Sequence, residues 1–463
     1  MLKVNMKYEK NAVSPKNKDG AILLEVNVTK GDTVKVARKK LNLSLAIDVS
    51  ISMSDNLSKK QYNGNDFFGR GMIGHAQILQ DKQVYINQLQ GNQETNMYSN
   101  ISKLVQAKKM ASKIVEDLED GDILSITTFS NVGKVIQEAK VITEASKALI
   151  LAKINNLSVE GNTNLYEGWE LSAREVAKYV SSKTLNRVIL LTDGVVNQGL
   201  RDSNITSRIE AMTKANIQTS AIGIGEGFQE DLLSTIAEKG EGNFFFIEKD
   251  EDFSTIINTE MSGLTDAALT NVEVVFTGKN TDFKQLNGFK EDGEVIKIPN
   301  LRGSKTTELM VEFSVKDKIT TPAKNKGFPP KIELGHIEIT GLDGNGNKIS
   351  YSQEISIQKV SDSDWEVMPA NGDVTLKKVM MNVALDQQKA SDMILKGQVT
   401  EARTLMASSA KMLKEDYSGS VIATAMANSI EGSLLKDNNS MSKTMRSASY
   451  SSRYGLMGDD DNS

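Results

Sequence analysis

Three oxygen-bearing side chains stand at alternate positions directly after a mostly apolar run. Leu43 to Ile47 has the pattern of a buried strand, and Asp48, Ser50 and Ser52 follow it. Alternate residues of an extended segment point to the same side, so these carboxylate and hydroxyl oxygens face one point. Oxygen donors of this kind suit Mg²⁺, with Ca²⁺ or Mn²⁺ as substitutes. The stretch therefore predicts part of a divalent-cation site.

Two further oxygen donors lie downstream in settings that suit the same site. Thr163 belongs to a polar segment, and Asp193 follows an apolar strand pattern that ends at Thr192. Ligands of parallel α/β sheets bind outside the carboxyl ends of the strands, and both aspartates are expected at such ends. Thr163 arrives on a separate loop and completes an all-oxygen set. The candidate metal ligands are Asp48, Ser50, Ser52, Thr163 and Asp193.

The residues from 41 to 264 alternate between short apolar runs and amphipathic stretches, which is typical of a parallel sheet with crossover helices. Strands are expected at 42–48, 122–129, 133–138, 187–192, 217–223 and 243–247. Helices are expected at 101–118, 143–156, 164–181, 203–215, 229–238 and 251–263. This order predicts an α/β fold with a doubly wound, mostly parallel, Rossmann-like sheet that positions the candidate ligands.

A segment rich in Asn, Gln and Gly interrupts this pattern at 54–100, two residues after Ser52. Loops of this length in compact domains are usually functional or disordered. The segment also carries apolar residues that would let it fold or dock. Two interpretations stay open: a solvated excursion, or a border of the metal site that covers it or supplies a carboxylate from Asp55, Asp66 or Asp81.

Alternating apolar residues on both sides of the α/β region predict a second, antiparallel domain. Residues 20–36 indicate two strands around the turn Lys30-Gly31-Asp32. Further strands are expected at 272–276, 295–298, 309–315, 332–339 and 349–357. Because two isolated strands are only marginally stable, we expect the N-terminal segment 1–40 to join 265–360 in one antiparallel β-sandwich.

The helical period returns near the C-terminus. Apolar residues at helical spacing, among them Leu376, Val379 and Val383, predict a helical hairpin or small bundle over 370–436, with a further helix at about 420–435. The last segment, 437–463, mixes Ser, Met, Arg, Gly and Asp without a period. We expect it to be a disordered tail.

The three motifs together resemble the metal-ion-dependent adhesion site (MIDAS) of von Willebrand factor type A (vWA) domains. The resemblance covers roughly 41–264, and the motifs stand in the family's order. It matches Asp48, Ser50 and Ser52 to the DxSxS motif, Thr163 to the threonine loop and Asp193 to the Thr-Asp-Gly motif. The β-sandwich and the C-terminal helices that follow are also similar to bacterial multidomain vWA proteins.

Two departures from the family pattern concern the shape of the site and access to it. Ile51 stands where many members have Gly, and the insertion at 54–100 is long. The resemblance nevertheless implies a metal that bridges to a Glu or Asp of a protein partner. Two carboxylates only just neutralise a divalent ion, so an acidic group can replace a bound water. We therefore expect a metal-dependent protein-interaction scaffold rather than an enzyme.

The composition of the chain disfavours several classes of function. With 55 basic and 60 acidic residues the net charge is −5, so no overall basic field attracts nucleic acid. The chain has no cysteine, and its histidines are His75 and His336, which disfavours thiolate, multi-histidine and Ser-His-Asp chemistry. No apolar run of about 18 residues and no apolar signal core are evident, so we expect a cytoplasmic protein without a membrane span.

Two other functions stay open. One is a structural subunit of a self-assembling or multiprotein complex, such as a homo-oligomer, in which the metal stabilises the fold. A Mg²⁺-dependent phosphohydrolase is the enzymatic alternative, since a metal with a flanking carboxylate can activate water. The sequence places no evident general base and no Lys or Arg beside the motifs to bind phosphate, which disfavours hydrolysis.

Overall fold

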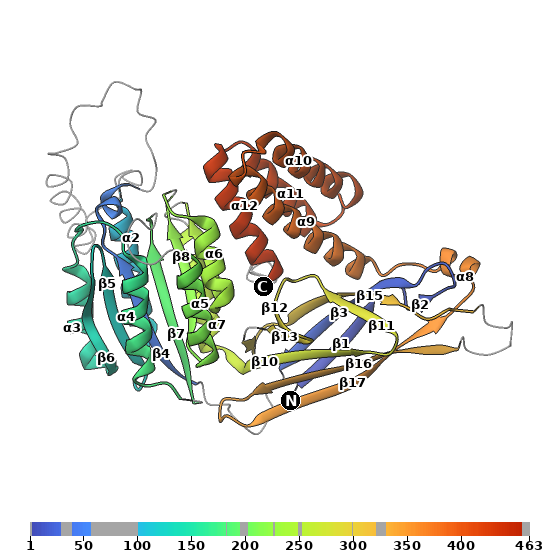
Figure 1. Ribbon diagram of the computed structural model, residues 1–463, viewed down its shortest axis with the longest axis horizontal. Helices are drawn as coiled ribbons and strands as arrows, with labels where there is room; N and C mark the ends of the chain where they lie inside the picture. The colour runs from blue at the N-terminus through green and yellow to red at the C-terminus, as the bar shows by residue number, and fades with distance from the viewer. Residues whose placement is uncertain are drawn as a thin grey trace. The chain divides into compact units, whose positions relative to one another are not determined.

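The computed structural model divides the chain into two compact units. One unit is Lys39–Thr265, and the other combines Met1–Arg38 with Asp266–Ser463. The two ends of the chain therefore build one unit, and the α/β unit is inserted between them (Figure 1). The residues that the structure describes are 2–28, 39–56, 101–181, 183–194, 202–225, 227–248, 252–298, 300–320 and 330–455.

The inserted unit is built on one sheet with the strand order β6-β5-β4-β7-β8-β9. Neighbouring strands are parallel except for the antiparallel pair β5 and β6. The central strands β4, β5 and β7 are buried along nearly their whole length because both faces of the sheet are covered. The bounds are β4 Lys40–Asp48, β5 Ile123–Phe129, β6 Gly133–Val141, β7 Thr184–Thr192, β8 Gln218–Ile224 and β9 Glu241–Ile247.

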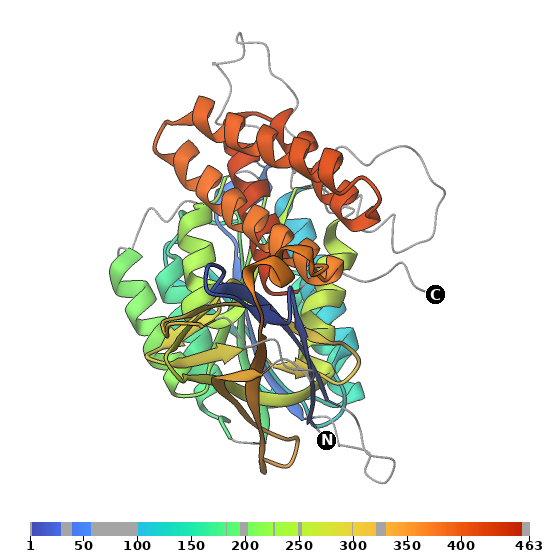
Figure 2. The ribbon, with the colours of Figure 1, turned by 90° about the vertical axis from the view of Figure 1, so that its right-hand side faces the viewer.

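Helices cover both faces of this sheet (Figures 1 and 2). Helix α2 packs with α3 and α7, while α4 packs on β4, β5 and β7, and α6 packs on β8 and β9. Trp169 of α4 is buried, and its indole N–H donates to Thr219 Oγ1 of β8 at 3.1 Å. The bounds are α2 Lys103–Asp117, α3 Glu144–Asn155, α4 Leu165–Ala177, α5 Asp202–Lys214, α6 Glu230–Lys239 and α7 Asp252–Thr265. The expected α/β fold with a doubly wound, mostly parallel sheet is confirmed.

The other unit contains two packed sheets with the orders β1-β3-β15-β11 and β12-β13-β10-β16-β17-β2. Apolar residues of both sheets, including Ile22, Val274 and Ile337, form their shared core. The strands of the first sheet are β1 Leu2–Tyr8, β3 Asp19–Val28, β11 Thr281–Gln285 and β15 Thr307–Val315. The second contains β2 Ala12–Val13, β10 Ala267–Gly278, β12 Lys290–Asp292, β13 Val295–Ile298, β16 Lys331–Leu342 and β17 Lys348–Lys359, and β14 Leu301–Arg302 pairs with β10.

Strand β3 joins the N-terminal segment to the sandwich. It pairs antiparallel with both β1 and β15. Ile22 and Leu24 point into the sandwich core, whereas Ala21 and Leu23 contact Val374 and Met381 of helix α9 (Gly372–Leu395). Burial on both faces explains why this strand has a continuous apolar run. The second strand and the turn expected within 20–36 lie largely outside the described residues.

The C-terminal helices α9, α10 (Val399–Asp416), α11 (Val421–Leu434) and α12 (Asn438–Arg453) pack around a common apolar core. A shorter helix, α8 (Asp362–Val367), precedes them. The expectation of a disordered tail over 437–463 is wrong for α12. Asp437 caps this helix by accepting the backbone N–H groups of Asn439 and Ser440, and Met441 and Met445 are fully buried.

Candidate metal centre

The first candidate ligand ends strand β4, and the next two follow on a short turn. Oδ1 of Asp48 accepts the backbone N–H of Ser50 at 2.8 Å, and a 3₁₀ helix, η1 (Ile51–Ser54), begins directly afterwards. This Asx-type bond turns the chain out of the strand. The backbone of Ile51 stays outside the positive-φ region. The turn therefore does not need glycine at that position.

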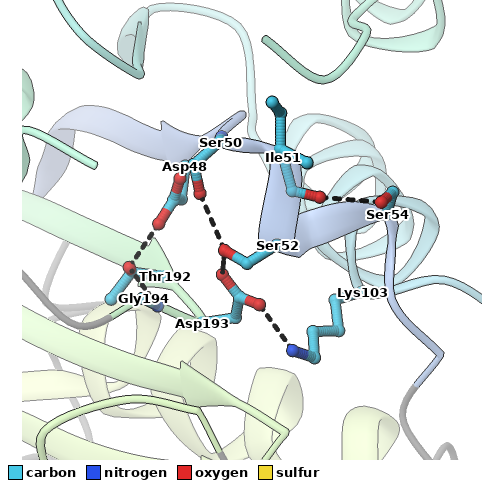
Figure 3. Close-up of polar contacts among 9 residues, drawn as sticks. All are labelled: Asp48, Ser50, Ile51, Ser52, Ser54, Lys103, Thr192, Asp193 and Gly194. Atoms are coloured by element: carbon cyan, nitrogen blue, oxygen red, sulfur yellow. Dashed lines mark hydrogen bonds and ion pairs between the residues drawn. The ribbon is translucent and has the colours of Figure 1, made fainter. Parts of the chain in front are cut away.

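A chain of polar contacts links this turn to the end of β7. Ser50 Oγ lies 3.0 Å from Ser52 Oγ, and Ser52 Oγ donates to Asp193 Oδ1 at 2.8 Å (Figure 3). Asp48, Ser50 and Asp193 are almost completely buried, at 0%, 1% and 1% exposure. Residues that are more than 140 positions apart in sequence thus meet at the carboxyl edge of β4 and β7.

Thr192 fixes the second oxygen of Asp48. Its hydroxyl donates to Asp48 Oδ2 at 2.6 Å, and it accepts the backbone N–H of Gly194 at 3.1 Å (Figure 3). The sequence pattern predicts Thr192 only as the end of a strand and does not predict this positioning role. The signal was present, since a hydroxyl residue directly before the second aspartate sits on the strand that pairs with β4.

Thr163 reaches the same place on a different loop. A Cβ built on Gly194 would lie 2.9 Å from Thr163 Oγ1 and 3.2 Å from Asp48 Oδ2. Glycine is therefore required at position 194 for these oxygens to lie close together. The threonine loop is held by main-chain bonds to the turn after β4: Ile51 N–H donates to Gly161 O at 3.1 Å, and Glu160 N–H donates to Val49 O at 2.6 Å.

The buried carboxylates of Asp48 and Asp193 bring two negative charges close together. Burial, and to a smaller extent the negative charge of Asp193, raise the pKa of Asp48 to about 6, against the hydrogen bonds from Ser50 and Thr192 that lower it. A cation would relieve this repulsion. Carboxylate and hydroxyl oxygens that converge from three segments match the donors that Mg²⁺, Ca²⁺ and Mn²⁺ prefer. The residues therefore fit a hard divalent cation.

This raised pKa predicts a pH-dependent stability in metal-free solution. Between the ordinary pKa of 3.8 and the folded value of about 6, the unfolded chain releases the Asp48 proton while the folded chain keeps it. The free energy of unfolding should therefore fall as the pH rises through this window, by at most about 3 kcal/mol. The Asp48→Asn variant should lack this pH-dependent contribution to the free energy of unfolding, because an amide does not titrate in this range. Urea unfolding of both proteins in chelator at pH 4 and pH 7 measures the difference, and parallel pH profiles would contradict the prediction.

A lysine that the sequence analysis did not single out completes the site. Lys103 Nζ donates to Asp193 Oδ2 at 2.5 Å, and its side chain is 8% exposed (Figure 3). The expectation that no Lys or Arg stands beside the motifs is therefore wrong in space. Lys103 is the first residue of α2, with Ser102 as the N-cap. A cation at the N-terminal, positive end of a helix is unfavourable unless an anion pairs with it. A lysine in the first turn of the helix expected at 101–118 was therefore the available signal in the sequence.

The described residues on either side of 57–100 contact each other beside this site. Lys103 N–H donates to Asp55 O at 3.0 Å, and Asn56 forms a β-bridge with Ser102. Of the carboxylates considered for the metal, Asp55 ends the 3₁₀ turn with an exposed side chain. Asp66 and Asp81 lie outside the described residues. The start of the insertion is thus joined to the start of α2 next to the carboxyl edge of β4.

Comparisons with curated proteins match part of the chain. The chain is 29% identical over 150 residues to uncharacterized protein YfbK of Escherichia coli (strain K12). It is 26% identical over 173 residues to uncharacterized protein sll0103 of a Synechocystis strain. The matches cover 32% and 37% of this chain but 26% and 40% of those relatives. The chain thus matches well under half of either relative's length.

Solved structures resemble a larger part of the chain. A von Willebrand factor type A protein from Catenulispora acidiphila superposes with a TM-score of 0.63 at 14% identity, over 94% of this chain and 89% of that one. The ArnB paralog VWA2 from Sulfolobus acidocaldarius gives 0.57 at 18% identity, over 97% and 99%. At such identities the likeness establishes the fold, and it extends over both units.

A family model, described as von Willebrand factor type A domain, matches residues 96–259. This range contains α2 and all the strands of the inserted sheet except β4. It also includes Lys103, Thr163 and Asp193, while Asp48 precedes it on a strand that pairs with β5 and β7. The inserted α/β unit of this chain is therefore a member of the von Willebrand factor type A domain family.

Proposed function

We propose that the vWA domain binds Mg²⁺, or Ca²⁺ or Mn²⁺ in its place, and thereby captures an acidic group of a protein partner. The candidate ligands are Asp48, Ser50, Ser52, Thr163 and Asp193. The observation that carries the proposal is the convergence of buried oxygens from three separate segments at one sheet edge. A bound divalent ion would supply a coordination position for a Glu or Asp oxygen of the partner.

The surroundings of the site support a protein as the partner. Ile51, between two candidate ligands, exposes 61% of its surface (Figure 3). A protein partner can bury this exposed apolar side chain when it binds beside the candidate metal site. A few such buried side chains supply most of the binding energy of a protein interface. The acidic group would give orientation, and the apolar contact at Ile51 would add affinity.

Hydrolysis of phosphate esters is less well supported. Lys103 is the cation that such a reaction would need near the metal, but its ammonium is engaged with Asp193 at 2.5 Å. The hydroxyls of Ser50 and Ser52 are bonded to each other, and Ser52 also donates to Asp193. These groups hold one another in place, and among the residues that the structure describes they leave no base for a water. We therefore keep a binding role without a catalytic step.

Partner capture tests the proposal. We expect the immobilised protein to retain a partner in Mg²⁺, to release it in chelator, and to release it when excess acetate competes. Ser52→Ala should lose capture because it removes a candidate ligand. Ser54→Ala is the matched control, since Ser54 lies on the same turn and its hydroxyl donates to Ile51 O at 2.7 Å, away from the site.

Ile51→Ser separates the two parts of the interaction. It should weaken capture about tenfold or more, in line with the loss of one buried apolar anchor, and leave calorimetric Mg²⁺ binding unchanged. Capture that persists in chelator and in Ser52→Ala would contradict the metal bridge. It would favour the alternative of a structural subunit whose metal only stabilises the fold, and large oligomers of the pure protein in size-exclusion chromatography would then be expected.

A further inference from the structure

Lys103 is an unusual residue to find buried against a cation site. It is the first residue of α2, where the helix dipole already places partial positive charge. Its side chain is 8% exposed and its ammonium contacts Asp193 at 2.5 Å. Removing a lysine from water is costly unless it is paired. The pairing with Asp193 is therefore what keeps the ammonium in the site.

The backbone around Lys103 is shaped to admit it. A Cβ on Gly225, whose φ is +70°, would lie 2.8 Å from Lys103 Cε. A Cβ on Gly227 would lie 2.7 Å from the carbonyl oxygen of Asp193 and 3.8 Å from Lys103 Nζ. Both glycines follow the end of β8, which pairs with β7, and Asp193 directly follows β7. Their missing side chains leave room for the stem of the lysine beside the second aspartate.

The lysine changes the charge of the site. Two carboxylates and a divalent ion sum to zero, but the ammonium of Lys103 adds one positive charge, and a carboxylate from a partner restores neutrality. We propose, resting on the proposed function, that Lys103 is a specificity-determining residue that weakens binding of the metal alone and strengthens binding of an acidic ligand to the metal-loaded site.

The proposal predicts two effects of opposite sign in Lys103→Met. Divalent-cation binding should become roughly tenfold to a hundredfold tighter, because a positive charge a few ångströms away no longer repels the ion. Binding of a carboxylate to the loaded site should become weaker by about tenfold, because the net positive charge is lost. Local misfolding would weaken the binding of both the cation and the carboxylate. Opposite changes in the two affinities therefore distinguish an electrostatic role of Lys103 from a structural one.

The experiment uses the full chain and two probes. Calorimetry measures Mn²⁺ binding, and paramagnetic broadening of the acetate methyl resonance measures acetate binding to the Mn²⁺-loaded protein. Lys103→Arg should retain the wild-type order of both affinities because it keeps the charge. Lys113→Met is the matched control, since it removes a lysine from the same helix that is paired with Asp117 at 2.5 Å at the surface.

The outcomes separate the two proposals. Tighter binding of Mn²⁺ together with weaker binding of acetate in Lys103→Met supports the proposed role of Lys103. The role of Lys103 is overturned if the wild type and Lys103→Met bind each ligand with equal affinity, or if Lys103→Met binds both Mn²⁺ and acetate more weakly. Either result leaves the metal-dependent function standing. Mn²⁺ binding to Lys103→Met but not to the wild type supports repulsion by Lys103 and overturns the proposed function. Failure of both proteins to bind Mn²⁺ overturns both proposals.

Discussion

Replacing Asp193 by alanine should abolish divalent-cation binding. Asp193 supplies one of the two carboxylates, and its Oδ1 accepts the hydroxyl of Ser52 at 2.8 Å, so the change also frees Ser52. Loss of groups that merely orient metal ligands costs about 10- to 100-fold in affinity, so loss of a carboxylate ligand should cost at least about a hundredfold. Calorimetric titration with Mg²⁺ and Mn²⁺ measures it, and near-wild-type affinity would contradict the assignment.

The same substitution should destabilise the metal-free protein. It leaves the ammonium of Lys103 buried without its counter-charge, which typically costs about 3–5 kcal/mol. The double variant Asp193→Ala/Lys103→Met removes both charges and should recover most of this stability while still failing to bind metal. Urea unfolding in chelator gives the stability. If the double variant is no more stable than Asp193→Ala, the pairing energy is not the cause.

Glu260→Ala is the second change with a large expected effect, and it lies away from the metal centre. Glu260 of α7 is completely buried. Its Oε1 accepts Ser220 Oγ at 2.7 Å and Arg187 Nη1 at 3.1 Å, and its Oε2 accepts Asn243 Nδ2 at 2.6 Å. The alanine would leave Arg187 buried without an anion, at a cost of about 3–5 kcal/mol.

Fluorescence can report this loss from the α/β unit alone. The chain has two tryptophans, and Trp169 lies in the α/β unit while Trp365 lies in α8, so a Trp365→Phe background leaves one probe. Glu170→Ala is the matched control, because Glu170 pairs with Arg174, which is 67% exposed, and surface pairs contribute at most about 1 kcal/mol. Equal losses in the two variants would show that the buried network is not the stabilising element.

The α/β elements were predictable because most of them have a recognisable local pattern in sequence. The strand expected at 122–129 is β5 (Ile123–Phe129), and the helix expected at 101–118 is α2 (Lys103–Asp117). Continuous apolar runs indicate strands covered on both faces, and amphipathic stretches between them indicate crossover helices. The apolar runs are continuous here because both faces of the sheet are covered.

Helix α12 (Asn438–Arg453) shows where this reasoning fails. It has few apolar residues, and much of what it buries is polar. Ser442 Oγ lies 2.9 Å from Ser391 Oγ of α9, and Arg446 bonds both Ser391 and Asp392. Such a helix is stable only against a partner that satisfies its polar groups, and composition alone does not reveal that partner.

The sequence by itself determined the α/β fold class and the candidate ligands, because both depend on local sequence patterns. Asp48, Ser50 and Ser52 follow one apolar run, and Asp193 follows another. Only the tertiary structure decided which charges share the site. Lys103 stands 51 residues after Ser52 along the chain, yet its ammonium contacts Asp193 because α2 begins against the turn that ends at Asp55. Electrostatic interactions depend on distance in space and on burial, and neither quantity is contained in the spacing of residues along the chain.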